Sequence, residues 1–150
     1  MPDSNFTLTP IGYVRNSVEQ PLPTGWDDVD SVIDVAPEHE AGLLALDGFS
    51  HLIVLSWLHL LPNDQRLVGQ AHLMGRDDLP TLGTFATRSP RRPNPLGIAI
   101  VLLLGVEGTK VTVRGLDAVN GTPILDIKPY LPPYDAPGNV QMPSWVWGRS

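Results

Sequence analysis

The clearest pattern of apolar and polar positions in the chain runs from Phe49 to Leu61. A period of two residues divides this segment into the two faces of a β-strand. The first face carries His51, Ile53, Leu55, Trp57 and His59, and the second carries Leu52, Val54, Ser56, Leu58 and Leu60. Because both faces are mainly apolar, we expect a central strand that is covered on each side.

Weaker alternation predicts further strands before and after this segment. The expected strands cover residues 6–15, 32–35, 67–74, 110–116 and 122–127. The apolar run from Leu96 to Val106 has a length that fits a strand or a buried helix, and its β-branched residues favour a strand. Asn120-Gly121 is the strongest hairpin signal and stands directly before the last expected strand.

Proline and glycine limit how much helix the chain can form. Sixteen of the 150 residues are proline and fourteen are glycine, which disfavours long helices and favours short strands joined by tight loops. One short helix is expected over residues 37–46, with Pro37 in its first turn and acidic residues near its positive end. We therefore predict a single, mainly β domain over residues 1–150. Its core spans about 6–132 and its tail, 133–150, carries tryptophans that should pack against another surface.

Composition excludes several kinds of chemistry. The chain has no cysteine, so disulfides, thiolate metal sites and a cysteine nucleophile are excluded. No charged-then-apolar segment opens the chain, and the apolar runs at 52–61 and 96–106 are too short to cross a bilayer. We therefore expect a cytoplasmic protein with no membrane partner.

The arginine loop, which we define as residues 83–97, is the most distinctive stretch of the sequence. Its prolines fix their own φ and push the preceding residues toward extended conformations, so the loop has few shapes available. It places three guanidinium groups within five positions, at Arg88, Arg91 and Arg92. A stiff loop of this kind loses little conformational entropy when it binds an anion. The alternative is a solvated, proline-rich surface loop.

The charge distribution favours an anion site near this loop. The chain has a formal net charge of −6, with ten basic and sixteen acidic residues. Residues 1–78 hold twelve of the acidic residues, whereas residues 79–128 hold six of the basic ones. A local anionic ligand or a locally docked RNA fits this asymmetry, and a protein that coats nucleic acid does not.

Ten polar side chains are candidates for a functional site. They are His51, His59, Arg88, Arg91, Arg92, Asn94, Asp117, Asn120, Asp126 and Lys128. Asp117 and Asp126 flank the Asn-Gly turn where strand meets loop, and the alternative for each is an Asx turn or a surface carboxylate. The two histidines either converge on one site or are separate buried residues, and His59, at the end of its strand, is the better candidate for a pocket. The chain contains no P-loop, Rossmann, nucleophile-elbow or zincin motif.

Three motifs and the expected first strand resemble one family. They are Phe-Ser-His-Leu at 49–52 with His59, Phe-Ala-Thr-Arg-Ser-Pro-Arg-Arg-Pro-Asn-Pro-Leu-Gly at 85–97, Leu-Asp-Ala-Val-Asn-Gly-Thr-Pro-Ile-Leu-Asp-Ile-Lys-Pro-Tyr at 116–130, and Ile-Gly-Tyr-Val-Arg at 11–15. Over residues 6–132 the chain resembles the TrmO/TsaA-like family, also called YaeB- or VirR-like. The second and third motifs are long and ordered, which makes the resemblance specific.

The resemblance implies an S-adenosylmethionine-dependent methyltransferase with a non-Rossmann, β-barrel-like fold that acts as a homodimer. Characterised members of the family N6-methylate threonylcarbamoyladenosine beside the tRNA anticodon. The family's cofactor contacts fall on Leu58, His59, Arg88, Ile98, Asp117, Ala118, Val119, Asn120 and Gly121. A further contact would fall near residues 23–25, in the loop after the first strand.

The chemistry of S-adenosylmethionine suits the residues that the resemblance selects. Arg88 can hold the ligand's carboxylate in a bidentate way, and the backbone of residues 118–121 can read the adenine edge. Because the sulfonium already activates the methyl group, the protein mainly aligns donor and acceptor and excludes water. A general base would help to deprotonate the acylated N6 of the acceptor, and the candidates for it are Asp117, Asp126 and His59. The residues expected to bind the substrate or its RNA are Arg91, Arg92, Asn94 and Lys128.

Three rival interpretations remain open at this point. The first is a module of the same fold that binds RNA or a nucleotide without turning it over. The second is a methyltransferase with a different small-molecule acceptor. The third is a metal-dependent hydrolase that would use His51, His59, His72 and Asp117 as ligands, although no pair of them has a recognisable metal-binding spacing.

Overall fold

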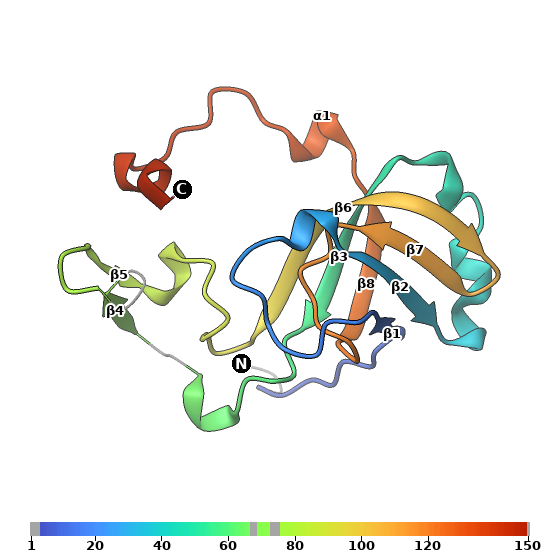
Figure 1. Ribbon diagram of the computed structural model, residues 1–150, viewed down its shortest axis with the longest axis horizontal. Helices are drawn as coiled ribbons and strands as arrows, with labels where there is room; N and C mark the ends of the chain where they lie inside the picture. Colours follow the sequence, from blue (N-terminus) through green and yellow to red (C-terminus); the bar gives the residue numbers. More distant parts are fainter. Residues whose placement is uncertain (1–3, 67–68, 73–75, 150) are drawn as a thin grey trace.

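A closed six-stranded barrel forms the body of the molecule (Figure 1). The computed structural model describes residues 4–66, 69–72 and 76–149. The strands follow one another around the barrel in the order β1-β2-β7-β6-β3-β8, and every neighbouring pair is antiparallel. Their bounds are β1 Gly12–Arg15, β2 Asp30–Val35, β3 His51–Trp57, β6 Leu96–Glu107, β7 Lys110–Arg114 and β8 Pro123–Pro129. The predicted mainly β, barrel-like fold is therefore confirmed.

The remaining elements are short. A separate two-stranded ribbon pairs β4 (Gln70–His72) with β5 (Thr81–Gly83). One α-helical turn, α1, covers Pro132–Asp135. The described 3-10 turns are Trp26–Asp28, Pro37–Leu43, Leu46–Gly48, Asn63–Gln65, Thr84–Ala86 and Ser144–Arg149. No helix among the described residues is both long and apolar enough to span a bilayer.

The barrel interior is filled by side chains from alternate positions of its strands. In β3, Leu52 and Val54 are fully buried, and Ser56 points the same way. Aliphatic side chains from the other strands and from the β7–β8 connection complete the core, namely Val14, Ile33, Val35, Val101, Val111, Val113, Leu116, Ala118 and Ile124. Inward and outward residues alternate because successive side chains of a strand point to opposite faces of the sheet.

The outer face of β3 and β6 differs from what the sequence predicted. Ile53, Leu55 and Trp57 of β3 point outward and are half-buried, so this strand is covered on one face and only partly on the other. On the neighbouring strand β6, Leu96, Ile98 and Ile100 pair with these residues, and they are exposed together with Leu102 and Leu104. We call these outward residues of the two strands the apolar sheet face. The alternation correctly predicted two apolar faces, but a single chain covers only one of them.

Several expected elements are shorter than their patterns. The first strand begins at Gly12 and not at residue 6, because residues 6–9 are exposed and pair with no strand. The expected helix over 37–46 is a 3-10 helix that ends at Leu43, and Ala45 adopts a left-handed φ of 68° that prevents its continuation. Of the strand expected over 67–74, the structure has β4, while residues 67–68 and 73–74 lie outside the described part.

The predicted hairpin at Asn120-Gly121 is wrong. The turn itself forms, with Gly121 at a φ of 83°. However, β8 pairs with β1 and β3 and never with β7, so the turn lies within a connection that crosses the barrel end. In the tail, Trp145 is half-buried, and the side chain of Trp147 lies outside the described residues.

Three connections leave the same end of the barrel. Because the strands alternate in direction around the barrel, β1, β3 and β7 all finish at one end, where β2, β6 and β8 begin. The connections there are residues 16–29, 58–95 and 115–122. The second of them carries the ribbon β4–β5 and the arginine loop, and it projects to the left of the barrel in Figure 1.

Gly12 provides a test of this packing. A methyl group on this residue would overlap the backbone carbonyl of Asp34 on the neighbouring strand β2. We expect Gly12→Ala to lower the free energy of unfolding by about 1–3 kcal/mol, measured by urea denaturation. Gly42→Ala is the matched control, because nothing lies within 4 Å of a Cβ built there. Equal stability of the two variants would contradict the close approach of β1 and β2.

Candidate functional site

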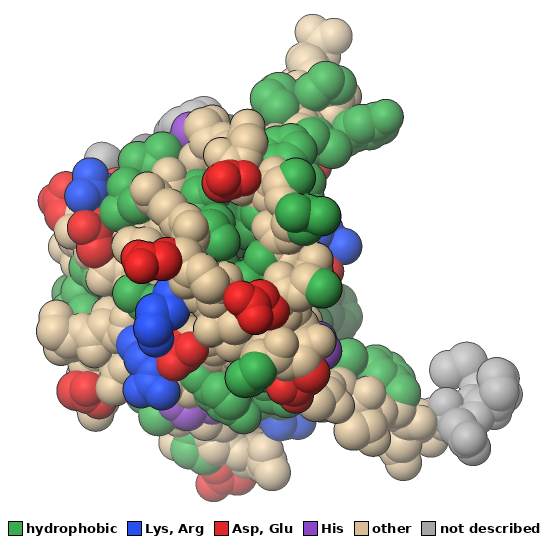
Figure 2. Space-filling model, turned by 90° about the vertical axis from the view of Figure 1, so that its right-hand side faces the viewer, with side chains coloured by type: hydrophobic (Ala, Val, Ile, Leu, Met, Phe, Trp, Pro, Cys, Tyr) green, Lys and Arg blue, Asp and Glu red, His purple; other side chains and the backbone are tan. Residues whose placement is uncertain are grey.

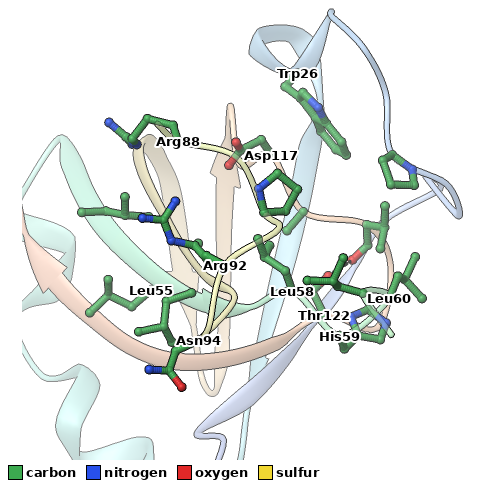
Figure 3. A pocket seen from close by; sticks show the side chains of 18 of the residues that line it. Trp26, Leu55, Leu58, His59, Leu60, Arg88, Arg92, Asn94, Asp117 and Thr122 are labelled. Atoms are coloured by element: carbon green, nitrogen blue, oxygen red, sulfur yellow. Dashed lines mark hydrogen bonds between the residues drawn. The ribbon is translucent and has the colours of Figure 1, made fainter. Parts of the chain in front are cut away.

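A hollow of about 970 Å³ lies where the three connections meet (Figure 3). Its lining comes from four stretches of the chain, within residues 21–26, 55–61, 85–98 and 117–122. Apolar side chains make up most of the wall, and the charged groups on it are Arg88, Arg92 and Asp117. A large, mainly apolar cavity with a few convergent polar groups is the usual form of a small-molecule site.

The end of β3 forms one wall because the chain leaves the barrel there. The backbone amide of Leu58 donates to the carbonyl oxygen of Pro95 at 2.8 Å, which joins the end of β3 to the arginine loop. Leu58 and His59 therefore lie beside the loop and line the hollow, and His59 has the pocket position that its place at the end of the strand suggested. His51, at the other end of β3, is exposed and shares a 2.7 Å hydrogen bond with the Ser50 hydroxyl, so the two histidines do not converge.

Side chains of the arginine loop hold it in shape by donating hydrogen bonds to its own backbone carbonyls. The Thr87 hydroxyl donates to the Thr84 carbonyl at 2.8 Å. The guanidinium of Arg92 donates to the carbonyl oxygens of Thr87 and Ser89, at 3.1 and 2.9 Å. Arg92 therefore stabilises the loop through its own guanidinium. The donors that it uses there are not available to a ligand.

Arg88 differs from Arg92 in having no such tie. Among the described residues, no hydrogen bond or ion pair holds its exposed side chain. Figure 3 shows Arg88 near Asp117, with its guanidinium extending away from the Asp117 carboxylate, and its positive charge still acts on that group. A guanidinium that borders a cavity with its donors unused is suited to a carboxylate or phosphate ligand.

Asp117 lies in the connection after β7 and lines the same hollow as Arg88. Asp117 is an exposed residue, but the wall atoms around its carboxyl group partly desolvate it, and this partial desolvation raises the pKa of Asp117 above the ordinary 3.8. A hydrogen bond from its own backbone amide and the positive charge of Arg88 partly offset the rise. A carboxylate with a raised pKa in a cavity is a reasonable general base.

The adjoining wall is rigid backbone. Ala118 and Val119 are buried and line the hollow. The Thr122 hydroxyl donates to the Val119 carbonyl at 2.7 Å, and the amide of Gly121 donates to the Val14 carbonyl at 2.7 Å. Asn120 and Gly121, which were also predicted to contact the cofactor, lie behind this wall and do not line the hollow.

The remaining predicted residues are divided between the hollow and other surfaces. Ile98 and Asn94 line the hollow, whereas Arg91 is exposed outside it. Asp126 and Lys128 form an ion pair of 2.9 Å on β8, and Asp126 borders a second, smaller hollow of about 310 Å³. The structure therefore separates Asp126 and Lys128 from the corner that holds Arg88 and Asp117.

The loop between β1 and β2, where a contact was expected near residues 23–25, supplies a wall through other residues that sequence reasoning missed. Pro21, Leu22 and Trp26 line the hollow, and the indole N–H of Trp26 donates to the Leu22 carbonyl at 3.1 Å. Phe85, whose side chain is 82% exposed, lies at the rim. Leu22, Trp26 and Phe85 are large apolar residues in polar, proline-rich loops. This contrast is the sequence signal that could have marked them as parts of a binding site.

No group of three or more metal-ligating side chains comes together in the described part of the chain. His59 and Asp117 line the hollow, while His51 and His72 do not. Only two of the four ligands proposed for a metal-dependent hydrolase therefore share one cavity.

Comparison with known proteins decides the family. The tRNA-methyltransferase O N-terminal domain matches residues 15–136, which is more than half of the chain. The chain belongs to the tRNA-methyltransferase O N-terminal domain family. The arginine loop, the end of β3 and the connection after β7 all fall within the matched residues. The predicted resemblance is therefore confirmed.

Relatives in this family carry two kinds of name. A probable S-adenosyl-L-methionine-binding protein of Methanothermobacter thermautotrophicus is 38% identical over 143 residues, which cover 92% of this chain and 99% of the relative. A probable S-adenosyl-L-methionine-binding protein of Archaeoglobus fulgidus is 46% identical over 110 residues, covering 73% of this chain and 29% of the relative. The human tRNA (adenine(37)-N6)-methyltransferase is 41% identical over 108 residues, covering 71% of this chain and 23% of the relative.

Solved structures of the family show the same architecture. The crystal structure of TrmO from Pseudomonas aeruginosa superposes with a TM-score of 0.72 at 30% sequence identity. The match covers 91% of this chain and 61% of the TrmO chain. The present chain therefore spans less than two thirds of that protein.

The electrostatic coupling of Arg88 and Asp117 can be measured directly. Since the positive charge of Arg88 favours the ionised carboxylate, Arg88→Gln should raise the pKa of Asp117 further above 3.8. A pH titration of the Asp117 side-chain carbon by NMR would report it. Arg91→Gln, outside the hollow, should leave this pKa unchanged, and a wild-type pKa at or below 3.8 would contradict the desolvated setting.

Proposed function

We propose that this protein is an S-adenosylmethionine-dependent methyltransferase that N6-methylates threonylcarbamoyladenosine beside the tRNA anticodon. The observation that carries the proposal is the corner of the hollow where the unpaired Arg88 meets the desolvated Asp117. Membership of the tRNA-methyltransferase O N-terminal domain family and the names of the relatives support the same activity. A tRNA acceptor would place the protein in the cytoplasm.

The residues of the hollow fit S-adenosylmethionine chemically. Arg88 has free donors for the ligand's carboxylate, which a bidentate pair would hold. Leu58, Ile98 and Val119 offer an apolar surface to the adenine ring and the methionine chain. The rigid backbone of Ala118 and Val119 can discriminate the adenine edge without reorganising when the ligand binds.

When bound, S-adenosylmethionine supplies an activated methyl group on its sulfonium. The acceptor N6 gains the methyl group and loses its proton, and we assign that proton to the Asp117 carboxylate. The raised pKa of Asp117 makes it a stronger base than an ordinary aspartate. His59 lines the same hollow and remains the second candidate for the base, whereas Asp126 lies apart from Arg88.

The rim of the hollow suits a local contact with RNA. Arg91 and Asn94 lie on the exposed side of the arginine loop, where they can reach phosphate or sugar oxygens. Phe85 offers an exposed ring on which a base could stack. On the face that Figure 2 shows, which is the right-hand side of the molecule in Figure 1, basic side chains lie among acidic ones and form no broad basic surface for RNA.

Binding and turnover can be separated by two substitutions. In calorimetric titration with S-adenosylmethionine, we expect Arg88→Ala to weaken binding by about 10- to 100-fold, because it removes a charge-assisted pair. Asp117→Asn should leave binding nearly intact and lower kcat by about 10²- to 10⁴-fold, measured by mass spectrometry of tRNA nucleosides. Lys110→Ala, at the start of β7 on the opposite barrel end, is the control.

The outcomes distinguish the proposal from its rivals. If the wild-type protein releases no heat with S-adenosylmethionine, the methyltransferase assignment fails. Binding without any methylated nucleoside would favour a non-catalytic module of the same fold. Methyl transfer to a free nucleoside or another small molecule, and none to tRNA, would replace the proposed acceptor.

We also propose that the protein is a homodimer that assembles through the apolar sheet face. Ile100 is 55% exposed at the centre of β6, and its neighbours on both strands are apolar. A contiguous apolar patch of this kind on a sheet marks an interaction surface. The strand pattern that predicted cover on both faces of β3 is consistent with a second copy as that cover.

Mutation of the apolar sheet face tests the dimer. We expect Ile100→Asp to convert the protein to a monomer in light scattering coupled to size-exclusion chromatography, because a carboxylate cannot be buried there without a partner. Leu44→Asp is the matched control, since Leu44 is 89% exposed and lies outside this face. A wild-type protein that is already monomeric at high concentration would contradict the proposal.

A further inference from the structure

The side chain of Asn16 joins three parts of the chain just after β1. Its amide nitrogen donates to the Ser31 hydroxyl and to the Ala118 carbonyl, both at 2.9 Å. Its amide oxygen accepts a 3.0 Å hydrogen bond from the backbone N–H of Val18. The residue is partly buried, and both of its amide hydrogens and its oxygen are in use.

Asn120 completes the arrangement from the other side. Its amide oxygen accepts from the backbone N–H of Asn16 at 3.2 Å, and its amide nitrogen donates to the carboxylate of Glu19 at 3.1 Å. Its backbone N–H donates to the Val18 carbonyl at 2.7 Å. We call this reciprocal set of bonds among Asn16, Asn120 and Glu19 the amide clasp.

The amide clasp holds two walls of the hollow at a fixed separation. On one side stands the β1–β2 loop, which brings Leu22 and Trp26 to the cavity, and on the other stand Ala118 and Val119. Between residues 20 and 29, the only side-chain hydrogen bond among the described residues is the one from Trp26 to Leu22 within the loop itself. The loop is therefore held against the opposite wall mainly at its two ends, by the clasp at the start and by backbone at the finish.

We propose that Asn16 and Asn120 are positioning residues, and that the amide clasp sets the width of the hollow and so the affinity for its ligand. The probe ligand, S-adenosylmethionine, rests on the proposed function. The clasp requires amides, because each side chain both donates and accepts. A carboxylate at position 120 would keep the bond from the Asn16 N–H but would face the carboxylate of Glu19 across about the present 3.1 Å.

A pair of isosteric substitutions tests the clasp without removing any atoms from the packing. Asn120→Asp should weaken binding of S-adenosylmethionine by on the order of tenfold at low ionic strength, since it replaces a hydrogen bond by like-charge repulsion. Adding Glu19→Gln should restore affinity to within about threefold of wild type, because the glutamine amide can donate to the new carboxylate. Glu19→Gln alone is the matched control, because it removes the charge of residue 19 but keeps a side-chain oxygen that can accept from the Asn120 amide.

Amide exchange gives a readout that needs neither ligand nor activity. By NMR of the ligand-free protein, the backbone amides of Val18 and Asn120 should exchange several-fold faster in Asn120→Asp and return to wild-type rates in the double variant. An Asn120→Asp variant with unchanged affinity and exchange would overturn the proposal. A double variant that stays as weak as Asn120→Asp would overturn it too.

Failure of the clasp is distinguishable from failure of the proposed function. If the wild-type protein does not bind S-adenosylmethionine, the methyltransferase assignment falls, and the exchange rates alone decide whether the clasp holds the loop. If the wild-type protein binds and the exchange rates change without any change in affinity, the clasp is merely structural and its positioning role is refuted.

Discussion

Closure of the barrel is the constraint on which the rest of the structure depends. The shortest strand of the barrel, β1, must pair with β2 on one side and β8 on the other to complete the ring, and its ladder with β8 pairs only Gly12 and Tyr13. Gly12 permits β2 to approach so closely that no side chain fits between them. In the closed barrel, the alternating strand directions bring three connections to one end, and the hollow is built from these connections and the adjoining ends of β3 and β6.

The two arginines that line the hollow, Arg88 and Arg92, differ in how they use their guanidinium groups. Arg92 uses its guanidinium on carbonyl oxygens of its own loop, where the prolines leave backbone acceptors without amide partners. That internal bracing keeps the loop in one shape while Arg88 retains its donors for something outside the protein. The charge of Arg88 also moderates the cost of keeping Asp117 in a desolvated wall. A braced loop, a guanidinium with unused donors and a carboxyl group of raised pKa thus come from one short loop and one turn.

Sequence reasoning reached the strands and most of the hollow but missed features that depend on distant pairing. The alternation in β3 and the β-branched residues of β6 carry their own signal, so both strands were predicted. The Asn-Gly turn is a local signal as well, yet whether it closes a hairpin depends on which strands lie beside it, and here β8 pairs elsewhere. Trp26 was missed because its loop reads as polar, and Asp126 was grouped with Asp117 because sequence distance does not reveal that β8 carries it away from the barrel end.

The ring of hydrogen bonds around the barrel has a consequence for assembly. In an open sheet, the edge strands of two protein copies can pair through main-chain hydrogen bonds. Such pairing does not depend strongly on the side chains, so it tolerates many sequences and strand registers. Each of the six barrel strands here has a paired neighbour on both sides, so the barrel has no outer strand for such pairing. Association through the apolar sheet face would therefore rely on side chains, whose shapes select one partner and one orientation.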